Sequence, residues 1–259
     1  MSLENISMAK LAIAGVFFVT FFVAERLVNA ANQPKDLPRL LRNGGLWLVV
    51  FALSPFIVAP IAGLGANELL WRRPEWMNEG APAIVVFIGT LLALDCWTYW
   101  LHRAYHKVPL MWRLHEIHHR DEFLDTTSAF RFHIFEVVLS ALLRLIPIAL
   151  LAVPLQMVII FEALLLSTAI FHHSNVRLPK GLETGLSRII VTPSIHWVHH
   201  HARKQDTDSN YAAILSVWDR LFGSASPSAR ILDMKIGVEG VEDQSLLRLM
   251  LMPLMRRRP

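Results

Sequence analysis

Cysteine is almost absent from this chain of 259 residues, which contains only Cys96. One thiol cannot form an intramolecular disulfide, and it cannot build the cysteine-rich sites that hold structural zinc. The chain also has no GxGxxG segment, so it lacks the phosphate-binding turn of a dinucleotide-dependent protein. Any metal chemistry must therefore depend on side chains other than cysteine.

Charge is the second scarcity, because 18% of the residues are charged and 54% are hydrophobic. No charge interrupts Leu11–Ala24, residues 43–67 or residues 80–94, and residues 137–171 contain only Arg144 and Glu162. A helix needs about 20 apolar residues to cross a bilayer. A soluble protein with a large helical core is the alternative. The runs favour an all-α integral membrane helical bundle.

The apolar runs also predict an order of elements. A third span is expected over residues 82–101, and residues 137–171 have room for two helices of roughly 17 residues, each about 26 Å long. Such a hairpin returns the chain to the side that it left. Glu25 and Arg26 interrupt the small-residue region of a cleavable signal, so the first run is expected to be an uncleaved anchor.

We expect one domain in three parts. Residues 1–94 form a membrane anchor region, residues 95–223 a core that carries the chemistry, and residues 224–259 a tail. Within the tail, residues 246–258 are expected to form a short interfacial helix with a basic end.

The basic residues predict an orientation. The sequence pI is about 9.5, but the basic residues flank apolar runs and form no stripe with exposed aromatics, so nucleic acid is not expected as a partner. Contact with anionic lipid head groups is the simpler interpretation. Arg72 and Arg73 are the main basic residues of one predicted loop, and the opposite side carries a larger set. That set comprises Arg26, Lys35, Arg39, Arg42, Arg103, Lys107, Arg113, Arg120, Arg177 and Lys180. The positive-inside rule places the second side in the cytoplasm, and the inner membrane of a bacterium is the expected location.

Histidine is abundant in one region only, since all twelve histidines lie between His102 and His201. Residues three and four apart share a helix face, and HRAYH, HEIHH and HWVHH all have that spacing. Neutral imidazoles in such numbers can hold more than one transition metal without cysteine. The predicted ligands are His102, His106, His115, His118, His119, His173, His196, His199 and His200. His172 is the alternative to His173, and His201 lies about 140° from His196 around a helix, so it is treated as a bystander.

Other polar residues are candidates for orienting these imidazoles. Asp95 shares a helix face with His102 and His106, so it can hydrogen-bond to a ligand or, alternatively, pair with an arginine. His133 is either a ligand or, with Glu136, a group that faces a ligand or the substrate.

Two other classes of protein fit part of the pattern. Residues 115–119 match HExxH, in which Glu116 would be the general base of a membrane zinc metalloprotease. That site needs only two histidines and one further ligand, and it leaves most of the histidines unexplained. A histidine-rich metal transporter or metal-binding protein would carry its ligands at bilayer depth, whereas these follow the ends of the apolar runs.

The motifs resemble the fatty acid hydroxylase/sterol desaturase superfamily of membrane non-haem di-iron enzymes. The resemblance runs from Asp95 to Gly223 through DCWTYWLHRAYHKVPLMWRLHEIHH, SAFRFHIFE, FHHSNVRLP, TPSIHWVHH and NYAAILSVWDRLFG. The last two segments look most like the alkylglycerol monooxygenase and bacterial sterol-desaturase-like branches. Some relatives have a histidine where this chain has Thr168, which affects the number of ligands.

The resemblance implies a function. Two iron ions would activate O2 and oxidise a C–H bond of a membrane lipid such as a fatty acyl, alkylglycerol or sterol-like substrate, by hydroxylation or, alternatively, desaturation. It implies a reductase or carrier protein as electron donor. In the matching segments, Asn210 and Asp219 join Asp95, His133 and Glu136 as candidates for supporting the ligands. The oligomeric state is not addressed by these patterns.

Overall fold

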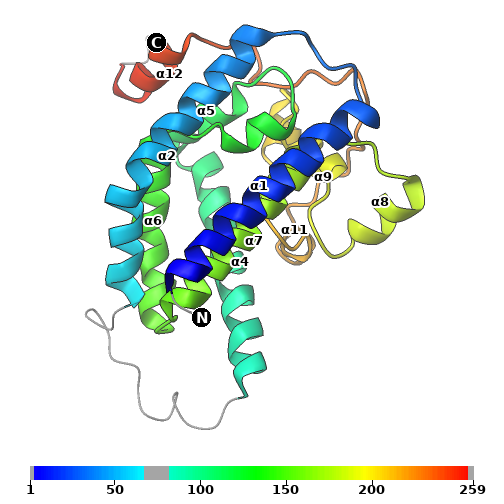
Figure 1. Cartoon of the computed structure of the whole chain (residues 1–259). Helices are drawn as coiled ribbons and strands as arrows, with labels where there is room; N and C mark the ends of the chain where they lie inside the picture. The colour runs from blue at the N-terminus through cyan, green and yellow to red at the C-terminus, as the bar shows by residue number, and fades with distance from the viewer. Residues whose placement is uncertain (1–2, 67–81, 256–259) are drawn as a thin grey trace.

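The architecture is a set of long helices that carries a cap of short helices and loops at one end (Figure 1). The computed structural model describes residues 3–66 and 82–255, and these contain helices, turns and isolated β-bridges but no β-strand. Residues 67–81, with Arg72 and Arg73, and residues 256–259 lie outside the described parts. The predicted all-helical class is confirmed.

In the part of the chain that the structure describes, four helices are long and apolar enough to cross a membrane, as the apolar runs predicted. They are α1 (Leu3–Leu27), α2 (Leu37–Ala66), α4 (Ala83–Lys107) and α7 (Leu155–His173). Helix α2 continues through Pro55 and Pro60, which membrane helices tolerate. Large apolar side chains such as Val16 and Phe56 are exposed on the outside of these helices, a surface that suits lipid rather than water.

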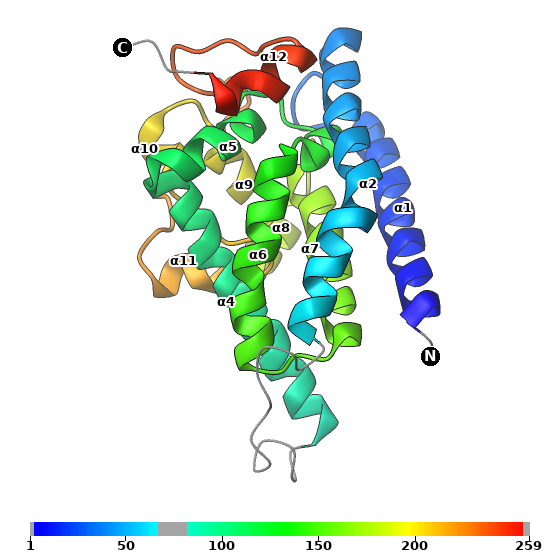
Figure 2. The same ribbon diagram turned by 90° about the vertical axis from the view of Figure 1, so that its left-hand side faces the viewer.

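The predicted hairpin is present. Helix α6 (Ile134–Leu150) descends from the cap, the chain turns at residues 151–154, and α7 returns to the cap. Ala152 adopts a positive φ of 44° in this turn. Helix α1 packs along α7 and α2 packs along α6, so the two N-terminal helices cover one side of the hairpin, and α4 lies on its other side (Figure 2).

The cap contains the remaining elements. They are α5 (Pro109–His119), η1 (Thr126–Phe130), α8 (Lys180–Leu186), α9 (Pro193–His199), α10 (Lys204–Thr207), α11 (Val217–Leu221), α12 (Leu246–Leu251) and η2 (Met252–Leu254). The break between α4 and α5 has a local cause. Val108 is extended (φ −96°, ψ 115°) because a residue before proline avoids the helical region, and Pro109 then starts α5 at a position that needs no N–H donor.

Buried ion pairs join the cap to the long helices. Arg39 of α2 contacts Asp121 at 2.5 Å and Asp125 at 2.7 Å, and all three side chains are at most 3% exposed. Arg131 is fully buried and binds Asn43 of α2 at 2.7 Å and Asp243 of the tail. The general expectation that basic residues beside the apolar runs contact lipid head groups does not hold for Arg39, because its partners lie inside the cap.

The C-terminal tail packs against the cap. Leu249 of α12 is fully buried against Leu46 of α2 and Ile117 of α5, and Arg113 of α5 donates to the Pro253 carbonyl at 2.9 Å. The predicted helix is present over Leu246–Leu251, and its exposed side includes Leu247 and Leu254 of the following η2 turn. The tail thus supports α5, the helix that carries HEIHH.

Candidate metal centre

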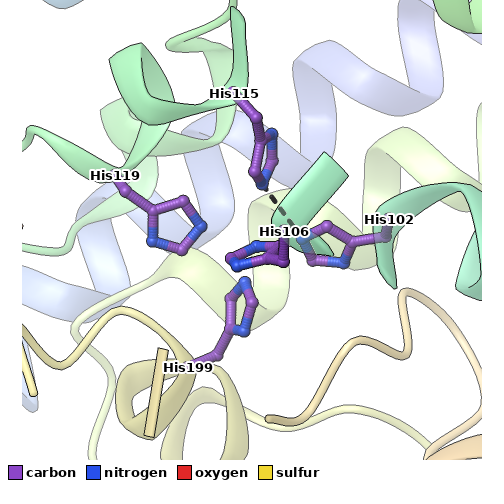
Figure 3. A group of neighbouring side chains, drawn as sticks. All are labelled: His102, His106, His115, His119 and His199. Atoms are coloured by element: carbon purple, nitrogen blue, oxygen red, sulfur yellow. Dashed lines mark hydrogen bonds between the residues drawn. The ribbon is translucent and has the colours of Figure 1, made fainter. Parts of the chain in front are cut away.

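The structure brings all nine predicted ligands together in two adjoining groups. The first group contains His102, His106, His115, His119 and His199, whose rings converge on one centre in Figure 3. The second group contains His118, His173, His196 and His200. Within each group the nearest ring nitrogens all lie within 4.8 Å of one another. The rings of His119 and His200 stack at 4.3 Å between centroids, so the groups touch.

Helix geometry explains this division. The corner at Val108–Pro109 folds α5 back against the end of α4, which places His115 and His119 beside His102 and His106. His118 projects from another direction of α5, because adjacent helix residues differ by about 100°. It therefore meets His173 at the end of α7. Helix α9 supplies His199 to the first group and His196 to the second, and its C-cap residue His200 joins the second.

Hydrogen bonds fix the protonated nitrogen of several imidazoles. A carbonyl can only accept, so a ring nitrogen that bonds to one must carry the hydrogen. Nδ1–H of His102 donates to the Tyr211 carbonyl at 2.7 Å, and that of His199 donates to the Ser209 carbonyl at 2.7 Å. His118 donates in the same way to Arg131 at 3.2 Å, and His173 to Ala169 at 2.8 Å. In each of these rings Nε2 is left with a free lone pair.

The free lone pairs face one another. Nε2 of His118 lies 3.1 Å from Nε2 of His173, although neither nitrogen has a hydrogen to donate. The Nε2 atoms of His102 and His115 are also 3.1 Å apart. Two nitrogens bound at right angles to one ion at about 2.1 Å would stand roughly 3.0 Å apart. A cation between the rings removes the repulsion, so the donor set fits metal ions.

Other ring nitrogens in the groups also lack partners. Among the described residues, both nitrogens of His106 and His119 are buried without a hydrogen bond, and so are Nε2 of His199 and Nδ1 of His196 and His200. Such groups are costly to bury unless something binds them. Aromatic side chains close the site, because Trp112 packs on His106 and His119, and Phe132 stacks on His118 at 4.6 Å.

Burial also keeps the imidazoles in the form that binds metal. Removal from water, reinforced by neighbouring imidazoles, holds the pKa of His118, His119, His196 and His200 well below the ordinary 6.5. Burial lowers the pKa of His199 to about 3. Neutral rings at neutral pH have lone pairs available for metal ions.

The remaining histidines lie outside the two groups. His172 is buried and its ring is 4.1 Å from that of His196, but His173 is the one whose nitrogen joins the second group. His133 caps α6 by accepting from the Phe135 N–H, and its Nε2 bonds to the Met250 carbonyl at 3.0 Å, so both of its ring nitrogens have protein partners. His201 pairs with Asp206 at 2.7 Å.

Glu136 contacts a histidine of the first group, whereas Thr168 bonds within its own helix. The Glu136 carboxylate lies 2.7 Å from Nδ1 of His115, so it orients that ring from α6. Thr168 donates to the Leu164 carbonyl of its own helix at 2.9 Å, and the group that includes His173 therefore has four histidines.

Asp95 and Asp219 hydrogen-bond to the loop between α10 and α11, and carbonyl groups of this loop accept from two of the imidazoles. Asp95 accepts from the backbone N–H groups of Ile214 and Leu215 and from the Trp218 indole. This differs from the expected bond to a ligand. Asp219 accepts from the N–H groups of Tyr211 and Ala212 at 2.7 and 3.0 Å.

Asn210 shapes the same loop. It adopts a positive φ of 51° and bonds to the Ile195 carbonyl and the Ser226 N–H. These anchors fix the Ser209 and Tyr211 carbonyls that accept from His199 and His102.

Several supporting groups had not been foreseen. Tyr105 donates to the Glu136 carbonyl at 3.0 Å and lies 2.8 Å from the Ser140 hydroxyl, which ties α4 to α6 beside His115. Arg131 holds the Ile117 carbonyl with its side chain while its own carbonyl accepts from His118. The (i, i+4) spacing of Glu136 and Ser140 was a visible signal, but a backbone acceptor has none.

Glu116 is engaged elsewhere. Arg120 contacts the Glu116 carboxylate at 2.6 Å, one turn along α5. The HExxH histidines, His115 and His119, share their group with three more histidines, which is more than a protease site requires.

The chain is similar in sequence to several known enzymes. The chain is 27% identical over 218 residues to an ornithine lipid hydroxylase, OlsE, of Rhizobium tropici, covering 84% of this chain and 64% of that protein. It is 31% identical to human alkylglycerol monooxygenase over 80% of this chain and 46% of that protein. It is 26% identical to mouse lathosterol oxidase over 85% of this chain and 75% of that protein.

The chain therefore spans 64% of the hydroxylase and about half of the human monooxygenase. No solved structure matches it. A profile of the fatty acid hydroxylase family matches residues 87–224, a stretch that contains every histidine of both groups. Because that match covers more than half of the sequence, the chain belongs to the fatty acid hydroxylase family.

Proposed function

We propose that this protein is a di-iron enzyme that uses O2 to hydroxylate or monooxygenate a C–H bond of a membrane lipid. The observation that carries the proposal is the pair of adjoining histidine groups, buried where membrane-length helices α4 and α7 enter the cap. The family membership and the lipid-oxidising relatives support the same reaction class.

The nine histidines of the two groups would hold the iron ions. Acid–base side chains cannot break an aliphatic C–H bond, so a redox metal must supply that chemistry. In the balanced reaction, R–H, O2, two electrons and two protons give R–OH and water. The protein's own contribution is to keep the imidazoles neutral, to fix their rings through the Glu136 carboxylate and the loop carbonyls, and to close the site with Trp112 and Phe132.

The substrate would be a fatty acyl, alkylglycerol or sterol-like lipid that reaches the site from the bilayer. Desaturation is the alternative outcome, because it shares hydrogen removal and differs in the step that follows. Electrons would come from a separate reductase or carrier protein. We place the cap in the cytoplasm, on the basis of the basic loops, in the inner membrane of a bacterium.

The test is lipid analysis of cells that express the iron-supplemented protein under 18O2. The expected result is a lipid that has gained one labelled oxygen, absent from cells that express His199→Ala. A lipid that has lost two hydrogens without gaining oxygen would identify a desaturase. No change in any lipid, with both metal sites filled, would refute the proposal.

A further inference from the structure

Three ionisable side chains of α1, α6 and α7 meet away from the histidines. Lys10 of α1 contacts Glu162 of α7 at 2.5 Å, and Arg144 of α6 lies 3.8 Å from the other oxygen of the same carboxylate. Arg144 and Glu162 are the only charged residues of the 137–171 run. Charges in such segments are costly and usually mark a functional position.

The charges of Lys10, Arg144 and Glu162 do not balance. Two cations share one carboxylate, and the distance from Arg144 to Glu162 is an ion-pair contact that is too long for a hydrogen bond. Within the described parts of the chain, Arg144 donates no hydrogen bond, and its Nε is buried without a partner. Its guanidinium lies 5.8 Å above the Phe161 ring. A guanidinium with free donors among apolar side chains is suited to bind an anion.

Arg144 also lies on the same face of α6 as a residue that contacts the first histidine group. Glu136, Ser140 and Arg144 are spaced four residues apart and share one face of α6. Glu136 bonds to His115 of the first histidine group, and Ser140 bonds to Tyr105. Arg144 is eight residues from Glu136, or about 12 Å along the helix axis. The Arg144 side chain remains 13% exposed, so an atom of a ligand can contact it.

We propose that Arg144 binds the anionic group, a carboxylate or a phosphate, of a membrane lipid whose chain lies along α6 toward the histidines. That this lipid is also the one oxidised rests on the proposed function, whereas the binding does not. The competing interpretation is that the trio only clamps α1, α6 and α7 together. The two interpretations differ in what removal of Glu162 should do.

The experiment measures binding of radiolabelled oleate to the metal-free, full-length protein in phosphatidylcholine nanodiscs. Arg144→Gln should weaken binding about tenfold or more, because it removes a charged donor. Glu162→Gln should strengthen binding, because it removes the carboxylate that competes for Arg144. Arg177→Gln is the matched control, since it removes an exposed arginine outside the spans and should leave binding unchanged.

Further binding measurements identify the chemical group of the lipid that Arg144 binds. Oleyl alcohol has the same chain without the charge, and its binding should not respond to Arg144→Gln. Competition by phosphatidylglycerol would assign the anion to a phospholipid phosphate, and failure to compete would assign it to a carboxylate; both results support the site. Arg144→Lys should bind oleate with intermediate affinity, which provides a reading even if Arg144→Gln folds poorly.

The results expected of a simple clamp would overturn the proposal. A clamp predicts that Arg144→Gln and Glu162→Gln lower the thermal unfolding temperature together and weaken oleate binding equally, or leave it unchanged. Loss of enzyme turnover with normal oleate binding would count against the proposed function only.

Discussion

At the scale of single residues, the candidate site depends on which nitrogen of each imidazole faces the centre. Backbone carbonyls and the Glu136 carboxylate take the Nδ1–H of five rings and leave Nε2 directed at the neighbouring histidines. A partner of this kind sets the orientation and the basicity of its ligand, and its loss commonly costs 10–100-fold in metal affinity.

Glu136→Gln should therefore lower the metal affinity of the first histidine group by about 10–100-fold. Glu116→Gln makes the same chemical change on α5, where the partner is Arg120, and should leave the metal content and most lipid oxidation intact. Retained metal after graded chelation checks both variants. A protein that loses its activity in Glu116→Gln with metals bound, and keeps it in Glu136→Gln, would favour the protease interpretation.

A second residue pair separates ligands from bystanders within HWVHHH. His199 belongs to the first group, whereas His201, two residues on, pairs with Asp206. His199→Ala should abolish lipid oxidation and the binding of at least one metal, because it removes one ring from the first group. His201→Ala should retain both. Elemental analysis and product formation measure the contrast, and equal loss in the two variants would contradict the assignment.

Among the secondary-structure elements, the loop between α10 and α11 provides backbone carbonyls that accept from imidazoles of the site. Asp219 of α11 holds two N–H groups of this loop, and Asp95 of α4 holds two more. The loop carbonyls then accept from His199 and His102, which both belong to the first group. A substitution on α11 should thus weaken metal binding by the first group more than by the second.

Asp219→Ala should destabilise the protein by about 2 kcal/mol or more, because two buried N–H groups lose their acceptor. It should also release metal from the first group more readily than from the second. Asp233→Ala removes an exposed aspartate and is the control. Thermal unfolding and metal content after chelation are the measurements, and simultaneous loss of both metals at the wild-type unfolding temperature would argue against this role of the loop.

At the scale of the whole molecule, two groups of histidines predict two metals per chain. Protein purified without chelator and reconstituted with iron should contain close to two metal ions, although zinc can occupy the same imidazoles. Elemental analysis of full-length protein gives the number. At most one metal per chain after reconstitution would eliminate the two-metal centre.

The arrangement of the helices gives a prediction about topology. Lys204 lies in the cap and Gln156 lies at the far end of the α6–α7 hairpin, and both are exposed. In a background with Cys96 replaced, a cysteine at Gln156 should react with an impermeant thiol reagent in intact spheroplasts. One at Lys204 should react only after the membrane is opened. The reverse pattern would place the cap outside the cytoplasm, and labelling of both from one side would contradict a spanning hairpin.

The membrane helices and the chemistry of the ligands could be predicted from the order of the residues alone. A bilayer demands long uncharged runs, and such runs can be read without knowledge of the neighbours, so α1, α2, α4 and α7 were predictable. The (i, i+3) and (i, i+4) spacings likewise fix which histidines share a helix face. The short hairpin followed from the length of the 137–171 run, and it explains why His118 and His196 meet although they are far apart in the chain.

The division of the histidines into two groups, and the residues that support them, depend on how the helices pack. His118 and His119 are adjacent in sequence yet belong to different groups, because their partners come from α7 in one case and from α4 in the other. The choice of His173 over His172 depends on the rotation of α7 against α9. The carbonyls of Ser209 and Tyr211 act through the backbone, which every residue has, so no sequence pattern marks them. Arg39 is internal because Asp121, 82 positions away, lies beside it in the fold.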